Sequence, residues 1–325
     1  MLLDFLNSAK RFLHINFVIY RDRRFPTVTF EAPNIAFHDV KFIERPLVEF
    51  KIKKIAALQD LVIYFGNIPP LFKHKTKVIL LLSNRYLIEK YPLNGLPYKT
   101  IIQVTVERML FKLFHKNADL IIVQSFVMQD LLFKMGLRPN IAKVMPYKNK
   151  DTVESSKIYR IPNSFLYVAD GLPHKNHRNL IYAWIRLAKE GIWPILYLTL
   201  DRNAKIYYWI KELAEEHDLK IEFLEKLPRN ELFVYYRKIS ALIYPSYFES
   251  YGLPILEAKY FEVPIIASEL DYVRDMLDPT ETFDPHSSKS ISRAIKRFLK
   301  QEEHRYDIIT ADSFINEIIE WANNT

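Results

Sequence analysis

The chain has 325 residues, of which 49% are hydrophobic and 14% aromatic, and its formal net charge is +8. That length suits two domains of about 150 residues each, and the apolar content excludes an intrinsically disordered chain. The absence of cysteine excludes disulfides and thiolate metal sites. The positive charge admits an anionic membrane or substrate as a partner. We do not expect nucleic acid as a partner, because no zinc-finger spacing or RNA-binding motif is present.

The first half of the chain alternates predicted helices and strands. Apolar residues at helical spacing predict an opening helix, and they are Leu2, Leu3, Phe5, Leu6, Ala9, Phe12 and Leu13. Strands are predicted at 14–20, 61–65, 77–82 and 119–124, and helices at 101–115 and 126–135. This alternation predicts a parallel α/β sheet. No apolar run has the length of a membrane span and no signal peptide is visible, so a cytoplasmic protein is expected.

The second half repeats the alternation after a segment rich in Pro, Asp and Ser at 145–161, which we interpret as an interdomain linker. Strands are predicted at 164–169, 194–200 and 220–223, and helices at 179–189, 205–217 and 230–238. A tail helix is predicted at 313–323. The predicted domains are therefore 1–150 and 151–310, followed by a C-terminal helix within 311–325.

Two carboxylates seven residues apart mark the most informative segment, residues 241–267. Glu249 lies in a predicted loop after the apolar strand 241–244, and Glu257 lies in the first turns of the following helix. Pro254 suits the start of that helix, where its missing N–H costs nothing. A second buried strand follows at 265–267. The unit is a βαβ crossover whose loop leaves backbone N–H groups at a helix N-terminus, which favours an anion such as a phosphate.

The string FESYGLPILEA in this unit resembles the E-x7-E motif of retaining family 4 (group 1) glycosyltransferases. The resemblance extends through PIIASELDYVRDMLDPTETFDP and LYVADGLPHKNHRNLIYAW, and it is close only in the C-terminal half. It implies the GT-B fold, in which two Rossmann-like α/β domains face an interdomain cleft. The implied activity is retaining transfer of a hexose or N-acetylhexosamine from a UDP- or GDP-sugar. The implied acceptor is a polyprenyl-diphosphate-linked oligosaccharide in O-antigen or capsule synthesis at the cytoplasmic membrane face.

The resemblance also assigns roles to individual residues. Lys175 would contact the donor diphosphate, Glu249 would lie near the transferred sugar, and Glu257 would accept hydrogen bonds from the ribose. Backbone N–H groups for the donor phosphates or sugar hydroxyls would come from Ser250, Tyr251, Gly252 and Leu253. No D-x-D motif is present, so neither a metal nor another cofactor is expected. Lysine, arginine and a helix N-terminus must then supply the positive field.

Three positions depart from the family's pattern. Asp170 stands where an arginine is usual, Ser83 where a histidine is usual, and Glu225 where a glycine is common. Which other cation compensates for the lost arginine is left open among Arg178, Arg202 and Lys226. On the acceptor side, Asn84 and Arg85 are candidates to bind sugar hydroxyls or phosphate, and an ordinary loop is an equal alternative.

The chain also opens directly with a helix, whereas relatives of this kind begin with a strand and a glycine-rich loop. We therefore expect a shortened N-terminus, through a mis-assigned start codon or a true truncation. Two alternatives remain: a donor-binding but catalytically impaired homologue, and a GT-B enzyme of other chemistry such as an epimerase or phosphorylase. The basic and aromatic stretch 99–116 predicts a packed domain helix or a peripheral membrane contact. We favour the packed helix, and both interpretations hold together if the acceptor is lipid-linked.

Overall fold

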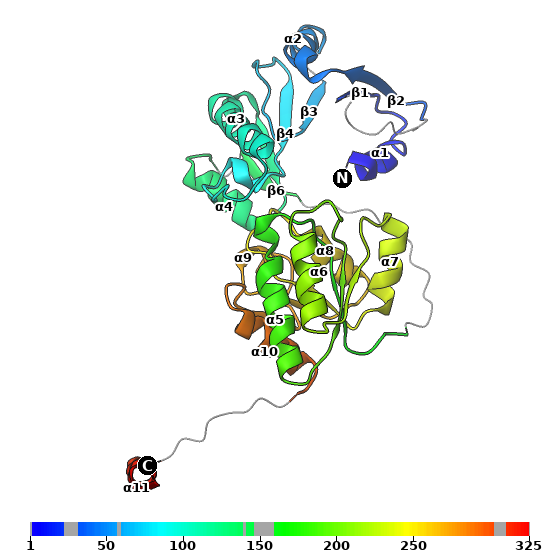
Figure 1. The fold of residues 1–325 in the computed structure, drawn as a ribbon. Coiled ribbons are helices and arrows are strands. Elements are labelled where there is room, and N and C mark those ends of the chain that lie inside the picture. The colour runs from blue at the N-terminus through cyan, green and yellow to red at the C-terminus, as the bar shows by residue number, and fades with distance from the viewer. Residues whose placement is uncertain are drawn as a thin grey trace.

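The computed structural model describes residues 2–22, 32–56, 60–138, 141–145, 159–301 and 310–324. These residues form two α/β domains, with the N-terminal domain above the C-terminal one in Figure 1, and a terminal helix that stands apart. This architecture agrees with the α/β fold class that the sequence predicts. Within the described residues, no helix is long and apolar enough to cross a membrane.

The N-terminal domain divides its strands between two parallel sheets. Four strands form the larger sheet in the order β3-β4-β5-β6, and β1 pairs with β2 separately. The strands are β1 (Phe17–Asp22), β2 (Ile35–Val40), β3 (Leu61–Phe65), β4 (Lys77–Leu81), β5 (Leu120–Val123) and β6 (Ala142–Val144). The helices are α1 (Leu2–Ala9), α2 (Arg45–Ile55), α3 (Tyr98–Phe114) and α4 (Phe126–Lys134), with a short 3₁₀ turn at Arg85–Leu87.

The larger N-terminal sheet has a compact apolar core. Val78 and Leu80 of β4 and Ile121 of β5 are buried, and Phe111 of α3 packs into the same cluster. Alternate residues of a strand point to opposite faces of the sheet. When both faces are covered, as for β4, nearly every residue of the strand is therefore apolar. The opposite face of α3 is exposed, which leaves several of its apolar residues uncovered.

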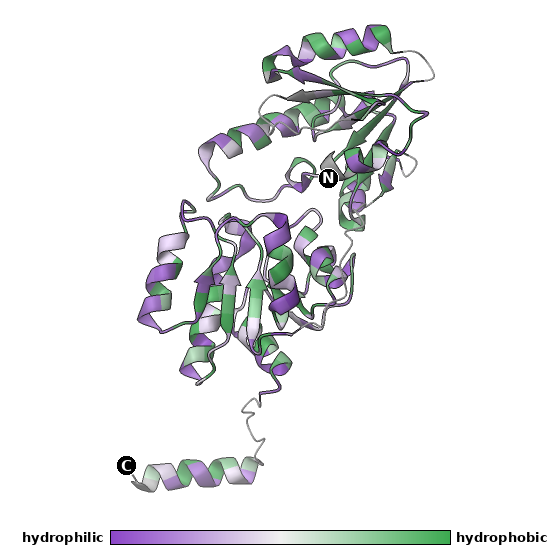
Figure 2. Ribbon diagram, turned by 90° about the vertical axis from the view of Figure 1, so that its right-hand side faces the viewer, coloured by the Kyte–Doolittle hydropathy of each residue, from purple (hydrophilic) through white to green (hydrophobic). Residues whose placement is uncertain are grey.

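The C-terminal domain has one six-stranded parallel sheet in the order β12-β11-β10-β7-β8-β9. Its strands are β7 (Ser164–Tyr167), β8 (Ile195–Leu198), β9 (Ile221–Phe223), β10 (Ala241–Tyr244), β11 (Ile265–Ser268) and β12 (Glu281–Phe283). Its helices are α5 (His177–Lys189), α6 (Tyr207–Glu216), α7 (Arg229–Lys238), α8 (Leu253–Tyr260), α9 (Asp271–Arg274) and α10 (Ser288–Phe298). Figure 2 shows the apolar strands at the centre of this domain and more polar helices around them.

The strand order of this sheet indicates where a ligand site is expected. From the central pair, β7 leads outward to β8 and β9, whereas β10 leads outward to β11 and β12. The chain therefore reverses direction across the sheet between β7 and β10. In open parallel sheets, ligands bind beyond the carboxyl ends of the strands at such a switch point. The loops that follow β7 and β10 are the two in which the sequence places Lys175 and Glu249.

Most of the predicted elements are confirmed, with ends shifted by up to three residues. The opening strand lies at Phe17–Asp22 instead of 14–20, and the opening helix ends at Ala9, four residues before the last predicted position, Leu13. The strand Ile35–Val40, the helix Arg45–Ile55 and the long helix Ser288–Phe298 were not predicted. The last of these packs against α5 and carries a buried face that includes Ile291 and Ile295. Of the predicted linker 145–161, residues 146–158 lie outside the described part of the chain.

The terminal helix α11 (Ala311–Asn324) is the largest difference from expectation. Packing of this helix back onto the N-terminal domain was one possibility that the resemblance to GT-B proteins raised, but Figures 1 and 2 show the helix apart from both domains. All of residues 310–322 are exposed. Its apolar side chains, such as Trp321 at 69% exposure, are therefore not buried against either domain.

Candidate donor site between the domains

Lys175 and Glu249 form an ion pair at the switch point of the C-terminal sheet. Lys175 ends the 3₁₀ turn after β7, and Glu249 lies in the loop after β10. The Lys175 Nζ lies 2.7 Å from the Glu249 Oε1, and their side chains are only 15% and 11% exposed. The hydroxyl of Tyr244 donates to the same Oε1 at 2.9 Å. The structure thus brings together the two residues that the sequence assigns to the transferred sugar and its phosphate.

The loop after β10 presents backbone donors at the start of α8. Gly252 has a φ of 71°, a left-handed conformation that favours glycine. A Cβ there would also lie 3.1 Å from the Cε of Met276. Within the described chain, no hydrogen bond is donated by the N–H groups of residues 250–253. Unbonded N–H groups at a helix N-terminus attract anions, so this loop can hold a phosphate.

Glu257 lies in the second turn of α8 and is held from the neighbouring helix α7. The hydroxyl of Tyr236 donates to its Oε2 at 3.0 Å, and the Arg229 guanidinium lies 3.6 Å from its Oε1. Tyr236 is fully buried, which fixes its hydroxyl beneath the carboxylate. Side chains of α7 therefore hold the Glu257 carboxylate in place.

The N-terminal domain contacts the Glu249 loop through an arginine and two aromatic residues. The Nη1 of Arg85 donates to the main-chain oxygen of Glu249 at 3.0 Å, and its guanidinium lies 4.6 Å from the ring centre of Phe248. The rings of Tyr86 and Tyr91 lie 4.6 and 4.3 Å from the same phenylalanine. The loop that carries Glu249 is therefore held from both domains.

A second contact between the domains lies at the N-terminus of α4. Ser125 caps this helix by accepting from the N–H of Met128, and its hydroxyl also donates to the main-chain oxygen of Ser250 at 3.2 Å. The N–H of Val127 donates to the Asp275 carboxylate at 2.8 Å. A carboxylate at this helix end satisfies an otherwise orphaned N–H group and complements the helix dipole.

Two histidines beside Lys175 are neutral for electrostatic reasons. Burial, with a smaller contribution from Lys175, lowers the pKa of His174 to about 4 and that of His177 to about 3. The Nδ1 of His174 lies 3.2 Å from the hydroxyl of Tyr86, which adds a further contact between the domains. Neither ring nitrogen of His177 has a hydrogen-bond partner within the described residues. Neither histidine adds positive charge at neutral pH.

The acceptor-side candidates are occupied by structural contacts. Both the N–H and the hydroxyl of Ser83 donate to the Asn67 side chain, as does the N–H of Asn84. The Asn84 side chain in turn accepts from the N–H of Tyr86, which caps the 3₁₀ turn. Arg85 also pairs with Glu89 at 2.5 Å. These contacts give Asn84 and Arg85 structural roles that do not require an acceptor substrate.

The three departures from the family pattern have separate structural outcomes. Asp170 accepts from the N–H of Leu172 and so shapes the turn that leads to Lys175. Glu225 adopts a φ of 53°, so the backbone keeps the conformation that a glycine would favour. Its side chain forms an exposed ion pair with Arg202. Arg178 lies over the ring of Trp209, and the side chain of Lys226 is exposed. Arg178, Arg202 and Lys226 therefore form no ion pair with Glu249 or Glu257 among the described residues.

The sequence missed the side chains that orient the two glutamates. Arg229 and Tyr236 stand seven residues apart on α7, and Tyr244 is the last residue of β10. Residues seven apart share one helix face, and the final residue of a strand can reach the loop that follows it. Those signals place Tyr236 on the same helix face as Arg229 and Tyr244 next to the loop of Glu249, but they do not identify the carboxylate that each tyrosine contacts.

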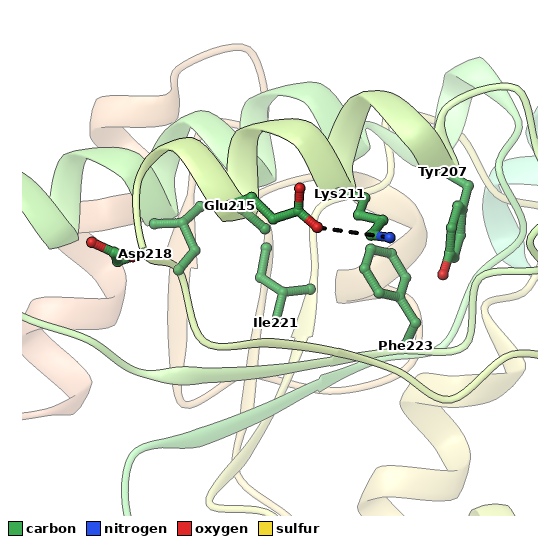
Figure 3. Close-up of a pocket in the computed structure, with 8 residues that line it drawn as sticks. Tyr207, Lys211, Glu215, Asp218, Ile221 and Phe223 are labelled. Atoms are coloured by element: carbon green, nitrogen blue, oxygen red, sulfur yellow. Dashed lines mark ion pairs between the residues drawn. The ribbon is translucent and has the colours of Figure 1, made fainter.

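Other features of the described chain lie away from these residues. Within it, no group of three or more His, Asp or Glu side chains is placed to hold a metal ion. A hollow of about 440 Å³ lies between α6 and the edge strand β9, as Figure 3 shows. Its lining includes Tyr207, Lys211 and Phe223, and none of the predicted site residues.

Solved structures with the same architecture define the fold class as GT-B. The chain is similar to the UDP complex of Anabaena HepE, with a TM-score of 0.63, 15% identity and coverage of 92% of this chain and 86% of that one. It is similar to WaaG, a glycosyltransferase involved in lipopolysaccharide biosynthesis, with a TM-score of 0.62, 14% identity and coverage of 92% and 86%. At these identities the likeness establishes the fold.

The sequence then places the chain within one family. Residues 149–312 match the model of the family described as glycosyl transferases group 1, and the chain belongs to that family. It is also 27% identical over 272 residues to the O-antigen chain mannosyltransferase RfbU of Salmonella typhimurium, covering 82% of this chain and 74% of that protein. The resemblance to group 1 glycosyltransferases is thereby confirmed, whereas a shortened N-terminus stays a prediction.

Proposed function

We propose that this chain is a retaining glycosyltransferase of O-antigen-type polysaccharide synthesis, using a nucleoside diphosphate sugar as donor. The observation that carries the proposal is the Lys175–Glu249 pair beside four unbonded N–H groups at the start of α8. A cation and a helix N-terminus together attract a diphosphate, and a carboxylate beside them suits the hydroxyls of a sugar. The similarity to an O-antigen mannosyltransferase supports a hexose as the transferred group.

In this proposal each site residue has one task. Lys175 and the N–H groups of residues 250–253 bind the donor diphosphate, and Glu257 accepts hydrogen bonds from the ribose hydroxyls. Arg229, beside Glu257, adds a positive charge that the sequence did not assign. These groups act without a metal ion, because they stabilise the charge that develops on the departing diphosphate.

The proposed reaction breaks the bond between the anomeric carbon and the phosphate oxygen. The electron pair leaves with the nucleoside diphosphate, and the acceptor hydroxyl attacks from the face on which the leaving group departs. Its proton passes to the leaving phosphate oxygen, so the anomeric configuration is retained and atoms balance. Glu249 is not assigned the role of a nucleophile, because this same-face step needs none; its Oε1 accepts from Lys175 and Tyr244.

The exposed face of α3 supports a lipid-linked acceptor and a peripheral membrane location. Its exposed apolar residues follow at intervals of three or four, and they are Tyr98, Ile102, Val106, Met109 and Leu113. Lys99, Lys112 and the adjacent Lys116 are exposed as well, and no exposed residue of this helix is acidic. An apolar stripe flanked by lysines is the pattern of helices that lie on anionic membranes.

The experiment is calorimetric binding of UDP, GDP and ADP, followed by turnover of the matching nucleotide sugars with a lipid-linked oligosaccharide extract. We expect one nucleotide to bind selectively, with at least tenfold weaker binding in Lys175→Ala and in Glu257→Ala (about 1.4 kcal/mol). Lys189→Ala and Glu212→Ala, at exposed positions of α5 and α6, are the matched controls.

The possible results separate the proposal from its alternatives. Binding with no turnover on any acceptor would favour the impaired homologue. Nucleotide release without an acceptor, or interconversion of the donor sugar, would favour an epimerase or phosphorylase. The absence of binding by a folded chain would contradict the donor site itself.

A further inference from the structure

Two buried tyrosines lie directly beneath the Lys175–Glu249 pair. Tyr167 is the last residue of β7 and Tyr244 the last residue of β10, and these strands are neighbours in the sheet. Their exposures are 0% and 1%, and their rings meet edge to face with 5.8 Å between centres. Because both strands end at the same edge of the sheet, both hydroxyls reach the loops that carry the site.

Each hydroxyl holds one member of the ion pair. The Tyr244 hydroxyl donates to the Oε1 of Glu249 at 2.9 Å, the oxygen that also accepts from Lys175 at 2.7 Å. The Tyr167 hydroxyl donates instead to the main-chain oxygen of Lys175 at 2.5 Å. One tyrosine therefore orients the carboxylate, and the other fixes the backbone of the lysine.

This arrangement makes the two oxygens of Glu249 unequal. Its Oε1 accepts two hydrogen bonds, which is the ordinary capacity of a carboxylate oxygen. Its Oε2 accepts none from the described residues. Two donors from different elements also stop the carboxylate from rotating about its terminal bond. Burial, together with the charge of Glu249, raises the pKa of Tyr244 well above its ordinary value, so its hydroxyl remains a donor at neutral pH.

We infer that Tyr244 is a positioning residue for the transfer reaction: it fixes the Glu249 carboxylate so that Oε1 holds Lys175 and Oε2 accepts a hydroxyl of the transferred sugar. The inference rests on the proposed function of this site. Tyr244 acts through Glu249 and not through the donor. Its loss should therefore affect the reacting geometry far more than the affinity for the nucleotide.

The test compares Tyr244→Phe with the matched variant Tyr272→Phe. Tyr272 is 2% exposed and donates its hydroxyl to the main-chain oxygen of Ser246 at 2.9 Å, an oxygen that keeps a second partner in Ser268 at 3.1 Å. Each substitution thus removes one buried hydroxyl and leaves its acceptor with another donor. We expect Tyr244→Phe to lower kcat at least tenfold and to change the Kd of the nucleoside diphosphate less than threefold. Tyr272→Phe should change both less than threefold.

A second measurement does not depend on turnover. Acetic anhydride modifies free amines, so the rate at which it labels Lys175, followed by peptide mass spectrometry, reports how firmly Glu249 holds that amine. We expect at least threefold faster labelling in Tyr244→Phe and an unchanged rate in Tyr272→Phe, with Lys189 as an internal reference. If the wild-type chain turns over no donor, the proposed function fails and this rate decides the positioning role. Equal effects of the two variants on both kcat and labelling would overturn the inference.

Discussion

The C-terminal domain closes one six-stranded sheet over a continuous apolar core, whereas the N-terminal domain divides its strands between a four-stranded sheet and a separate pair. The two domains also differ in how many apolar side chains they leave exposed. Ile43 and Leu47 in the N-terminal domain are 83% and 73% exposed, and α3 adds an exposed apolar stripe. The carboxylates of the candidate site all belong to the C-terminal domain. The comparison teaches that one domain holds the preformed candidate site, while the other supplies a contact to it and an uncovered surface.

Breaking the ion pair of the C-terminal domain should have the largest effect. Glu249→Ala removes the partner of a lysine that is only 15% exposed, which should lower the free energy of unfolding by about 2 kcal/mol. Turnover should fall at least a hundredfold, because the carboxylate near the sugar is lost. Urea unfolding and initial rates measure the two effects.

A double variant separates charge balance from chemistry. Lys175→Met with Glu249→Gln removes both charges together, so much of the lost stability should return, while turnover should stay low. Recovered turnover would contradict the role of the pair in the reaction.

Lowering the pH should destabilise the C-terminal domain, because His177 resists protonation in its buried position. Burial lowers the pKa of His177 to about 3 in the folded domain. Below pH 6.5 the histidine of the unfolded chain therefore binds a proton, whereas that of the folded domain stays neutral. Stability contributed in this way is present above pH 6.5 and is lost as the pH falls toward 3. Between pH 7.5 and 5.0 the loss should be about 2 kcal/mol for this one histidine.

His177→Phe should reduce this pH dependence, because neither ring nitrogen has a hydrogen-bond partner to lose within the described residues. His38→Phe, at an exposed position of the N-terminal domain, is the control. The measurement is the unfolding midpoint of the C-terminal domain at both pH values. An equal pH dependence in wild type and His177→Phe would refute the assignment.

Weakening the contact between the domains should have a smaller effect. Arg85→Ala removes the hydrogen bond to the Glu249 main chain and the stacking on Phe248. We expect kcat to fall about tenfold (~1.4 kcal/mol), with the nucleotide Kd within threefold, because the donor residues lie in the other domain. Arg138→Ala, an exposed arginine of the N-terminal domain, is the control. A loss of nucleotide affinity equal to the loss of kcat would show that the domains do not divide these tasks.

The smallest expected effect concerns the uncovered surface of the N-terminal domain. Lys112→Gln on α3 removes one positive charge, which should weaken binding to vesicles with anionic lipid several-fold, at about 1 kcal/mol per charge near the membrane. Lys189→Gln on α5 should leave vesicle binding unchanged. Cosedimentation at low and at physiological salt measures both, and equal binding by all three proteins would exclude α3 as the membrane contact.

Much of the C-terminal domain could be predicted because its strands are continuous apolar runs, and the loops after them carry glycine, proline and the charged motif residues. The strand Ala241–Tyr244 was predicted with its observed bounds, and Lys175 and Glu249, which the motif singles out, lie side by side, while their roles stay a prediction. The N-terminal domain was harder. Its strand Ile35–Val40 alternates apolar and polar residues only weakly, and the helix that follows has a proline near its start and a weakly amphipathic pattern.

The sequence by itself determined the alternation of strands and helices, the E-x7-E loop and the absence of cysteine chemistry, because periodicity and residue type are local properties. Only the tertiary structure decided which side chains orient the site. Arg85 meets Glu249 across 164 positions of the chain, and Tyr244 shares one carboxylate oxygen with a lysine from a different strand's loop. Such contacts depend on which strands become neighbours and how two domains meet, and no local pattern contains that information.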